Sequence, residues 1–215
     1  MAARKPDENA RMHASIPGMS EEPPRDSGER PPENGWRRQL FEYVLTLAFA
    51  FALVFGFIKP AVADSYRIPS SSMEPTLHGC AGCNNDRVMA NKFIYRFSEP
   101  ERGQIVVFRS VEDGDTLLIK RVVGVPGDKI QLRGGTLYLN GEPQDEPYVH
   151  ANPCNRHMPR TCAFGPVTVP RGHVFVMGDN RTNSRDSRFF GAVPEDNVEG
   201  EAFLRYWPPG RIGLL

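Results

Sequence analysis

Residues 43–58, YVLTLAFAFALVFGFI, form a run of sixteen positions without a charged side chain, and this run constrains the chain more than any other feature. A helix of that length covers about 24 Å, which is short of the roughly 30 Å hydrocarbon core of a bilayer. A helix extended over residues 39–62 would be long enough to cross this core. The run is apolar all round, which argues against a helix packed on a soluble core. We therefore predict a transmembrane helix over 39–62, with the lipid bilayer as a partner.

The residues that precede the apolar run indicate its orientation. Residues 1–36 hold six prolines and mixed charges, and a segment so poor in large apolar side chains is expected to be disordered. Basic residues before the run outnumber those just after it, with Arg25, Arg30, Arg37 and Arg38 against Lys59 and Arg67. The positive-inside rule then predicts a cytoplasmic tail (residues 1–38), one span of the plasma membrane and an extracytoplasmic body.

A removed secretory signal is the alternative to a retained anchor. Ala61-Val62-Ala63 has the A-x-A cleavage pattern, and Arg37-Arg38 has the form of a twin-arginine signal. The long region before the apolar run and the interruption by Lys59-Pro60 favour the anchor. Under either interpretation the body faces an extracytoplasmic space.

Beyond residue 63 the pattern is that of a β protein. Residues 129–140 alternate apolar and polar side chains around Gly134-Gly135, which predicts a hairpin. No sustained helical periodicity follows, so we predict a mainly β, antiparallel body (63–131 and 168–215) with an inserted hairpin and loop subdomain at 132–167. Residues 141–167 carry no clear strand. The predicted strands are short runs rich in Val, Ile, Leu and Phe at 87–93, 104–109, 116–123, 173–177 and 201–207.

Charge and motif content exclude several function classes. The 26 basic and 26 acidic side chains cancel, so no nucleic acid partner is expected. The sequence has no G-x-S-x-G, no H-E-x-x-H and no P-loop, which excludes a nucleophile elbow, a zincin and a P-loop nucleotide site. The four histidines of the body lie in no recognisable triad context: His78, His150, His157 and His173. We expect no cofactor and no catalytic metal.

Three serines, Ser70 to Ser72, lie between Pro69 and Pro75 shortly after the predicted span. A polar linker beside the membrane is the simplest interpretation of serines alone. Their neighbours Ile68, Met73 and Leu77 argue against it, because a flexible linker does not gather large apolar side chains around its serines.

Lys120 and Arg121 interrupt an otherwise apolar predicted strand, and alternation points them to opposite faces. One can be exposed, and the other then enters the interior or lines a cleft. An edge-strand lysine that discourages aggregation is the structural alternative. A buried lysine differs chemically, because burial can lower its pKa by about 3–5 units and leave a free amine that accepts a serine proton.

A third stretch, GDNRTNSRDSR at residues 178–188, follows the predicted strand at 173–177. By itself it indicates a polar turn held by Asp–Arg bridges. Together with S-M-x-P-T at 72–76 and K-R-V-x-G-x-P-G-D at 120–128, however, it resembles the sequence boxes of bacterial type I signal peptidases. These are membrane-anchored Ser/Lys endopeptidases that remove signal peptides, and the resemblance covers residues 64–131 and 168–207.

The resemblance implies a role for each matching residue. Ser72 would be the nucleophile and Lys120 its general base, while the Ser70 hydroxyl and the Ser72 amide would form the oxyanion hole. Ser184 would donate or accept a hydrogen bond that positions Lys120. Two positions depart from the family pattern, Ser71 for a frequent glycine and Thr182 for a frequent aspartate. The residues expected to rigidify this site are Arg121, Asp179, Asp186 and Arg188.

The resemblance also implies a signal-peptidase-like fold and a class of substrate. Exported preproteins would be cut after small residues in an A-x-A pattern, beside the secretion translocon. Cleavage of the chain's own Ala61-Val62-Ala63 by a second copy is a further hypothesis. We expect the shallow substrate pockets to be walled by Tyr66, Ile68, Pro69, Met73, Leu77, Leu118 and Ile119.

All four cysteines lie beyond the apolar run. Outside the cytoplasm disulfides are the default, and local pairs are the simplest of the three possible connectivities of Cys80, Cys83, Cys154 and Cys162. The alternative is a zinc site, for which the first pair has suitable spacing and His78 or His157 could add a ligand.

The alternative to a peptidase is a protein of a different functional class, a non-enzymatic, membrane-tethered β domain stabilised by its cysteines. Cleavage of an A-x-A peptide that is lost in Ser72→Ala would distinguish the two functions.

Overall fold

The computed structural model describes residues 35–54, 56, 63–149, 154, 157 and 159–215. Its first element is the helix α1 (Gly35–Leu53), which buries none of its residues. The helix takes in residues 35–38, which the sequence assigned to the tail. Among the described residues, no helix combines the length and the apolar character needed to cross a membrane.

The remaining predictions for the N-terminal region fall outside the described residues. This holds for the disordered tail over residues 1–34, for residues 55 and 57–62 of the predicted span, and for most of the A-x-A sequence. The transmembrane helix therefore stays a prediction.

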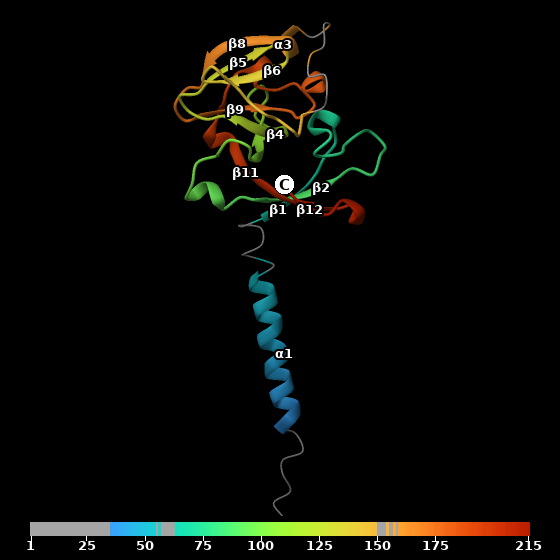
Figure 1. Cartoon of the computed structure of the whole chain (residues 1–215). Coiled ribbons are helices and arrows are strands. Elements are labelled where there is room, and N and C mark those ends of the chain that lie inside the picture. Colours follow the sequence, from blue (N-terminus) through green and yellow to red (C-terminus); the bar gives the residue numbers. More distant parts are fainter. Residues whose placement is uncertain (1–34, 55, 57–62, 150–153, 155–156, 158) are drawn as a thin grey trace, which may run out of the picture. The chain divides into compact units, whose positions relative to one another are not determined.

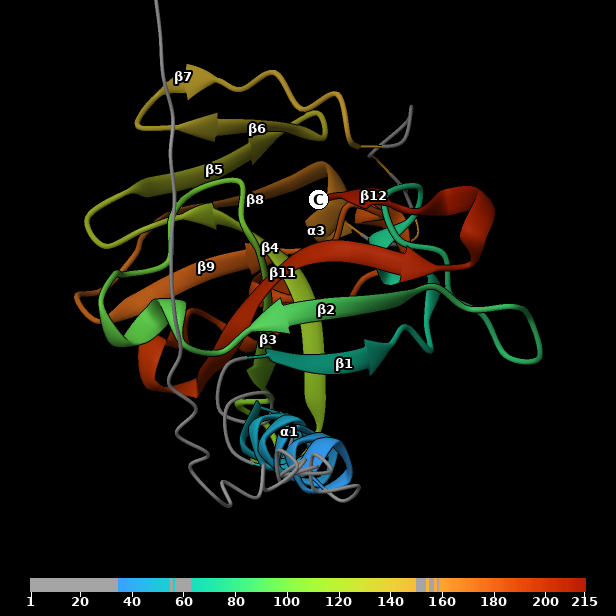
Figure 2. The ribbon, with the colours of Figure 1, turned by 90° about the horizontal axis from the view of Figure 1, so that it is seen from below.

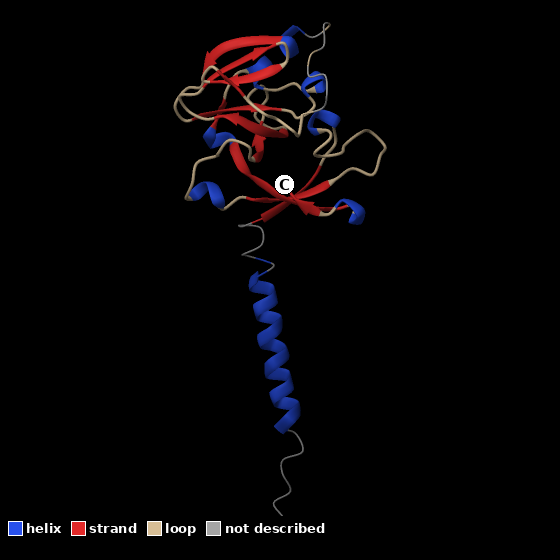
Figure 3. Ribbon diagram, in the orientation of Figure 1, coloured by secondary structure: helices blue, strands red, loops and turns tan. Residues whose placement is uncertain are grey.

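The body contains two antiparallel sheets, seen as the strands of Figures 1 and 3. The larger has the strand order β1-β2-β11-β3-β4-β9-β10, with β12 paired to β11. Figure 2 shows β1, β2 and β11 side by side, as their registers require. The strands are β1 (Ala63–Arg67), β2 (Arg87–Asn91), β3 (Ile105–Arg109), β4 (Leu117–Gly124), β9 (His173–Met177), β10 (Val193–Pro194), β11 (Val198–Trp207) and β12 (Gly213–Leu214).

The smaller sheet has the order β7-β6-β5-β8 and begins at Lys129, three residues before the expected insertion. Its hairpin is in the predicted place, with Ile130 opposite Leu139. Gly134 and Gly135 adopt φ angles of 58° and 87°, which two-residue hairpin turns of this kind require. The strands are β5 (Lys129–Arg133), β6 (Thr136–Leu139), β7 (Glu142–Pro143) and β8 (Ala163–Thr168).

The mainly β prediction is confirmed, with one error in the insertion. Residues 141–167 were expected to lack a clear strand, yet β8 pairs with β5 along much of its length. Gly165-Pro166 lies within β8 and removes the apolar–polar alternation by which a strand is recognised in a sequence. The helices of the body are short: α3 (Pro159–Cys162), α4 (Ser187–Phe190) and the 3-10 turns η2 (Ser71–Met73), η3 (Ile94–Arg96), η4 (Arg181–Asn183), η5 (Glu195–Asn197) and η6 (Pro209–Arg211).

The central strands of the larger sheet are covered on both faces. β3 buries four consecutive apolar side chains, so its sequence is continuously apolar rather than alternating. Ile105 and Val107 pack with Ile119 in one cluster, whereas Val106 and Phe108 pack in a second cluster. In β4 the residues from Ile119 to Gly124 are all buried, so a charged side chain there must find its partners inside the protein.

The cysteines form the local pairs expected from the sequence. Cys80 is bonded to Cys83 in the loop before β2, and Cys154 is bonded to Cys162 at the end of α3.

Candidate active site

The serine stretch is held as a tight turn rather than as a linker. Ser72 lies in the middle of the 3-10 turn η2 and is only 7% exposed. Ser70 precedes the turn in extended conformation and is exposed. The hydroxyl oxygens of the two residues are 3.2 Å apart and share a hydrogen bond. The turn thus places a covered hydroxyl beside one that is open to solvent.

Lys120 reaches the same turn from β4. Its Nζ donates hydrogen bonds to Ser72 Oγ at 2.9 Å and to the Ile119 carbonyl at 2.9 Å. The side chain is 4% exposed. Burial lowers the pKa of Lys120 from 10.5 to about 8, against a smaller opposing effect of the carboxylates of Asp186 and Asp179. About a tenth of this amine is therefore uncharged at pH 7, far more than for a lysine with the ordinary pKa.

Ser184 is buried but lacks the contact expected from the resemblance. It is 3% exposed, and its Oγ has no hydrogen-bond partner among the described residues. The predicted hydrogen bond to Lys120 is therefore absent, because the amine is directed to Ser72 and to its neighbouring carbonyl instead. The positioning role of Ser184 remains a prediction.

The loop after β9 holds the serine turn from the other side. Asn180 donates its backbone N–H to the Ser72 carbonyl at 3.1 Å and its side-chain amide to the Ser71 carbonyl at 3.0 Å. Gly178 makes this approach possible, since a Cβ there would lie 2.4 Å from the Ser72 carbonyl oxygen and 2.3 Å from Ser184 Oγ. The glycine that opens the GDN sequence is thus required by close backbone packing.

Arg121 points away from Lys120 and is paired. Its Nε and Nη2 donate to the two carboxylate oxygens of Asp179 at 2.9 and 2.7 Å, and Thr76 Oγ1 donates to the same carboxylate at 2.5 Å. Both adjacent cations are buried, Lys120 at 4% and Arg121 at 9% exposure. The expectation that one could be exposed is wrong, and the edge-strand alternative is excluded, because β4 is a central strand covered on both faces.

Asp186 and Arg188 form a second buried pair within the same loop. Two guanidinium nitrogens of Arg188 donate to the two Asp186 oxygens, each at 2.8 Å, and both side chains are fully buried. Asp186 also accepts the Gly178 N–H at 3.0 Å. The pair therefore fixes the start of the loop that packs on Ser72.

Three residues that extend this scaffold were not predicted. Arg181 is 1% exposed and donates two hydrogen bonds to Glu146, at 2.9 and 2.5 Å. The Tyr148 ring lies 4.0 Å from the Arg121 guanidinium, a cation–π contact. Arg181 belongs to the recognised box, but Glu146 and Tyr148 lie in the inserted segment, where no pattern marks them.

The residues expected to wall substrate pockets do not form one open surface. Ile68, Met73, Leu77 and Ile119 belong to a buried core cluster, and Tyr66 packs against it. Leu118 packs against a different cluster, with Val106 and Phe108, so grouping it with the others is wrong. Of the seven candidates only Pro69 is exposed. A surface hollow of about 1070 Å³ lies elsewhere, along Tyr95–Arg102, Val125 and Pro126.

The described residues thus define a mainly β protein with a buried serine–lysine pair on a scaffold of paired arginines. Comparison with known proteins identifies the family. The family described as "Signal peptidase, peptidase S26" matches residues 40–207. The chain belongs to this family.

Individual relatives agree with the family match. A probable signal peptidase I-2 of Synechocystis sp. is 42% identical over 87% of this chain and 80% of the relative. Signal peptidase IB of Staphylococcus aureus (strain Mu50) is 35% identical over 80% of this chain and 92% of the relative. A crystal structure of a signal peptidase I from Enterococcus faecalis V583 is 36% identical, with a TM-score of 0.42, and the match covers 48% of this chain and 97% of that one.

Proposed function

We propose that this chain is a signal peptidase I, a serine endopeptidase that removes N-terminal signal peptides from exported preproteins after an A-x-A-type site. One observation carries the chemistry. The Nζ of buried Lys120 is 2.9 Å from the Ser72 hydroxyl, and its pKa is lowered to about 8. An unprotonated amine at hydrogen-bond distance from a hydroxyl is the arrangement a general base and its nucleophile need.

The reaction then follows from the positions of these groups. Neutral Lys120 accepts the Ser72 proton while Ser72 Oγ attacks the carbonyl carbon of the scissile bond. The Ser70 hydroxyl, 3.2 Å from the attacking oxygen, is available to donate to the developing oxyanion. The ammonium of Lys120 returns its proton to the leaving amine. Water activated by the same amine hydrolyses the acyl-enzyme and restores Ser72.

Membrane attachment is part of the same proposal. Helix α1 leaves large apolar side chains exposed, among them Leu47 at 69% and Phe49 at 71%. A single helix cannot bury these apolar side chains against itself, whereas the hydrocarbon core of a bilayer would remove them from water. We infer that residues 39–62 anchor the chain in the plasma membrane, with the body on the extracytoplasmic side, where signal peptides emerge.

The test is cleavage of a synthetic peptide that carries an A-x-A site, by the full chain in detergent micelles. Ser72→Ala should reduce kcat by about 10⁶-fold, the typical effect of removing a catalytic serine. Ser98→Ala is the matched control, because Ser98 lies in the exposed loop after η3. This variant should cleave the peptide as the unmodified chain does. Undiminished cleavage by Ser72→Ala would reject Ser72 as the nucleophile. A chain that cleaves no A-x-A peptide would favour the non-enzymatic tethered domain.

A further inference from the structure

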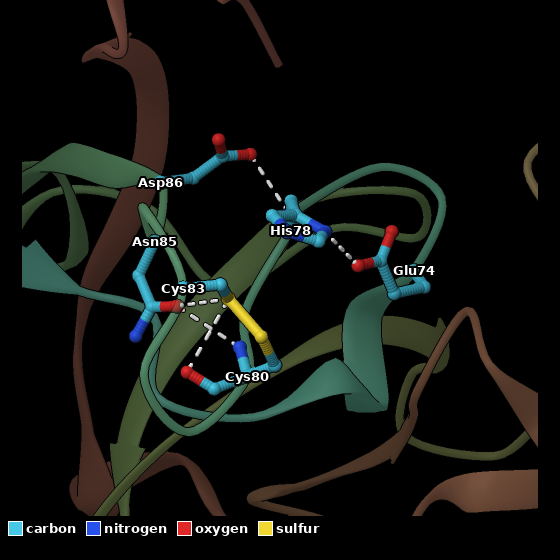
Figure 4. Close-up of a disulfide and its surroundings, with 6 residues drawn as sticks. All are labelled: Glu74, His78, Cys80, Cys83, Asn85 and Asp86. Carbon is cyan, nitrogen blue, oxygen red and sulfur yellow. Dashed lines mark hydrogen bonds and ion pairs between the residues drawn. A yellow bond between two sulfur atoms is a disulfide. The ribbon is translucent and has the colours of Figure 1, made fainter.

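The loop between η2 and β2 carries metal-ligand chemistry that the proposed function does not use. It contains the sequence His78-Gly-Cys-Ala-Gly-Cys83. A ring nitrogen of His78 and the Sγ atoms of Cys80 and Cys83 lie within 4.8 Å of one another. Figure 4 shows the imidazole beside the two sulfurs, with Glu74 on its far side.

These three side chains are the ligand types that zinc prefers. Zinc is bound by cysteine thiolates and imidazole nitrogens, and two cysteines separated by two residues are a common half of such a site. Thiolate ligands further select zinc over hard cations such as calcium and magnesium. In the oxidised protein both sulfurs are committed to the Cys80–Cys83 disulfide. A zinc site can therefore exist only after that bond is reduced.

We propose that His78, Cys80 and Cys83 form a zinc site in the reduced protein, so that the bound metal and the disulfide are alternative states of one loop. An external dithiol supplies two electrons and two protons, converting the disulfide to two thiols while the dithiol is oxidised to its own disulfide. Zinc then displaces the two thiol protons as both sulfurs bind. His78 supplies the third ligand, and the fourth position is left for water.

Glu74 orients the imidazole for this role. Its carboxylate forms a hydrogen bond with His78 Nδ1. A carboxylate on one ring nitrogen sets the tautomer and leaves the other nitrogen, here Nε2, to bind the metal. Glu74 therefore acts on zinc through His78 rather than as a ligand.

The frame of the loop is held by contacts other than the disulfide. His78 donates its N–H to the buried carboxylate of Asp86 at 2.8 Å, and the Asp86 N–H returns to the His78 carbonyl at 2.9 Å. Arg211 Nη2 donates to the same carboxylate at 3.1 Å. Asn85 Oδ1 accepts the Cys80 N–H at 2.9 Å. These bonds persist on reduction, so the ligands stay close together when the sulfurs separate.

The second disulfide provides an internal control. Cys154 and Cys162 are separated by seven residues rather than two, and among the described residues they belong to no group of ligand atoms close enough to share a metal. Reduction frees four thiols, and among the described residues only those at 80 and 83 lie beside an imidazole in this way.

The loop also touches the proposed active site. Gly79 packs so closely on the serine stretch that a Cβ there would lie 2.5 Å from the carbonyl oxygens of Ser70 and Ile68. A change of state at Cys80 therefore reaches the residue whose hydroxyl the proposed function assigns to the oxyanion hole. We expect the zinc-bound and disulfide forms to differ in kcat, an expectation that rests on the proposed function and is measured apart from metal binding.

The experiment measures zinc bound to the full chain in detergent micelles, by equilibrium dialysis and elemental analysis, with or without prior reduction by a phosphine under anaerobic conditions. The oxidised chain should bind no zinc and the reduced chain about one ion. Cobalt(II) in place of zinc should give thiolate-to-metal charge-transfer absorption. The Cys154→Ser/Cys162→Ser variant should behave as the unmodified chain, whereas Cys80→Ser/Cys83→Ser should bind none.

Substitutions beside the sulfurs sharpen the assignment. Glu74→Gln should weaken zinc binding by about 10–100-fold without changing the stoichiometry, as expected for a carboxylate behind a histidine ligand. His78→Asn should weaken it more. The proposal fails if the reduced chain binds no zinc, or if it binds zinc equally well without Cys80 and Cys83. Neither result would affect the peptide-cleavage test of the proposed function.

Discussion

The two sides of β4 treat a buried cation in opposite ways. Lys120 and Arg121 are consecutive, and both are almost fully buried. Arg121 meets a carboxylate in a two-point pair with Asp179. Lys120 contacts only a hydroxyl and a backbone carbonyl among the hydrogen-bond partners the structure describes.

The difference in partners gives the two residues different chemical properties. A paired guanidinium keeps its charge and its position, because it stays protonated in proteins and holds a carboxylate at two points. A buried ammonium without such a partner loses hydration that nothing replaces, and its pKa falls. The same burial therefore makes one residue a rigid part of the scaffold and gives the other the lowered pKa that the proposed base requires.

The largest expected effect comes from placing an arginine at both positions of β4, 120 and 121. Lys120→Arg keeps the positive charge but removes a group that can be uncharged, so kcat on an A-x-A peptide should fall by at least about 10²–10⁴-fold, the contribution of a general base. Circular dichroism would show that the variant is folded. A variant with more than a tenth of the original kcat would end the assignment of Lys120 as the base.

The matched change on the other side is Arg121→Lys. It loses the two-point contact with Asp179, and the free energy of unfolding should fall by about 1.5–3 kcal/mol, the value of a hydrogen bond to a charged group. Its effect on kcat should be far smaller than that of Lys120→Arg. Equal losses of kcat in both variants would show that the two sides do not differ in function.

Removing the charge of a fully buried pair should reduce stability more than Arg121→Lys does. Asp186→Asn leaves Arg188 without a counter-charge in the interior, so the free energy of unfolding should drop by about 3–5 kcal/mol in urea titration. Glu112→Gln is the control, because the Glu112–Arg185 pair is exposed and should leave stability unchanged within error. Similar results for the two variants would mean that burial does not set the value of these pairs.

Ser70→Ala tests the exposed neighbour of the nucleophile. Loss of one oxyanion donor should reduce kcat by about 10²–10³-fold with little change in KM, because the hydrogen bond strengthens only in the transition state. Ser70→Thr retains a hydroxyl and should recover part of the rate. A reduction in kcat below threefold for Ser70→Ala would exclude this hydroxyl from the oxyanion hole.

Much of this site could be predicted because its residues lie in short, distinctive segments. The proposed nucleophile, the proposed base and the Asp and Arg residues of the loop after β9 all fall within the three boxes of the sequence. The strands that carry them were also recognisable, since β2, β3, β4, β9 and β11 are apolar runs between turn residues.

What the sequence could not predict depends on the arrangement of the sheets. Burial of both Lys120 and Arg121 follows from the cover on both faces of β4, which alternation along one strand does not reveal. Glu146 reaches Arg181 from an insertion whose nearest strand pattern is broken at Gly165-Pro166. The pocket residues stay a prediction for a related reason, because apolar side chains beside a serine can equally well enter the core, as Met73 and Leu77 do.

The pH dependence of cleavage should show the smallest effect and tests the Lys120 side of β4. Because the active form of Lys120 is unprotonated and its pKa is about 8, kcat/KM should rise about tenfold per pH unit below pH 8 and level off above it.

The lowered pKa also means that the unfolded chain binds more protons between pH 8 and 10.5, so the free energy of unfolding should rise with pH in that window. Lys120→Met should lack this rise. Asp186→Asn, where it stays folded, should move the midpoint of kcat/KM to lower pH, since the Asp186 carboxylate favours the ammonium form. A kcat/KM profile that is flat from pH 6 to 9 would show that no group of this pKa acts as the base.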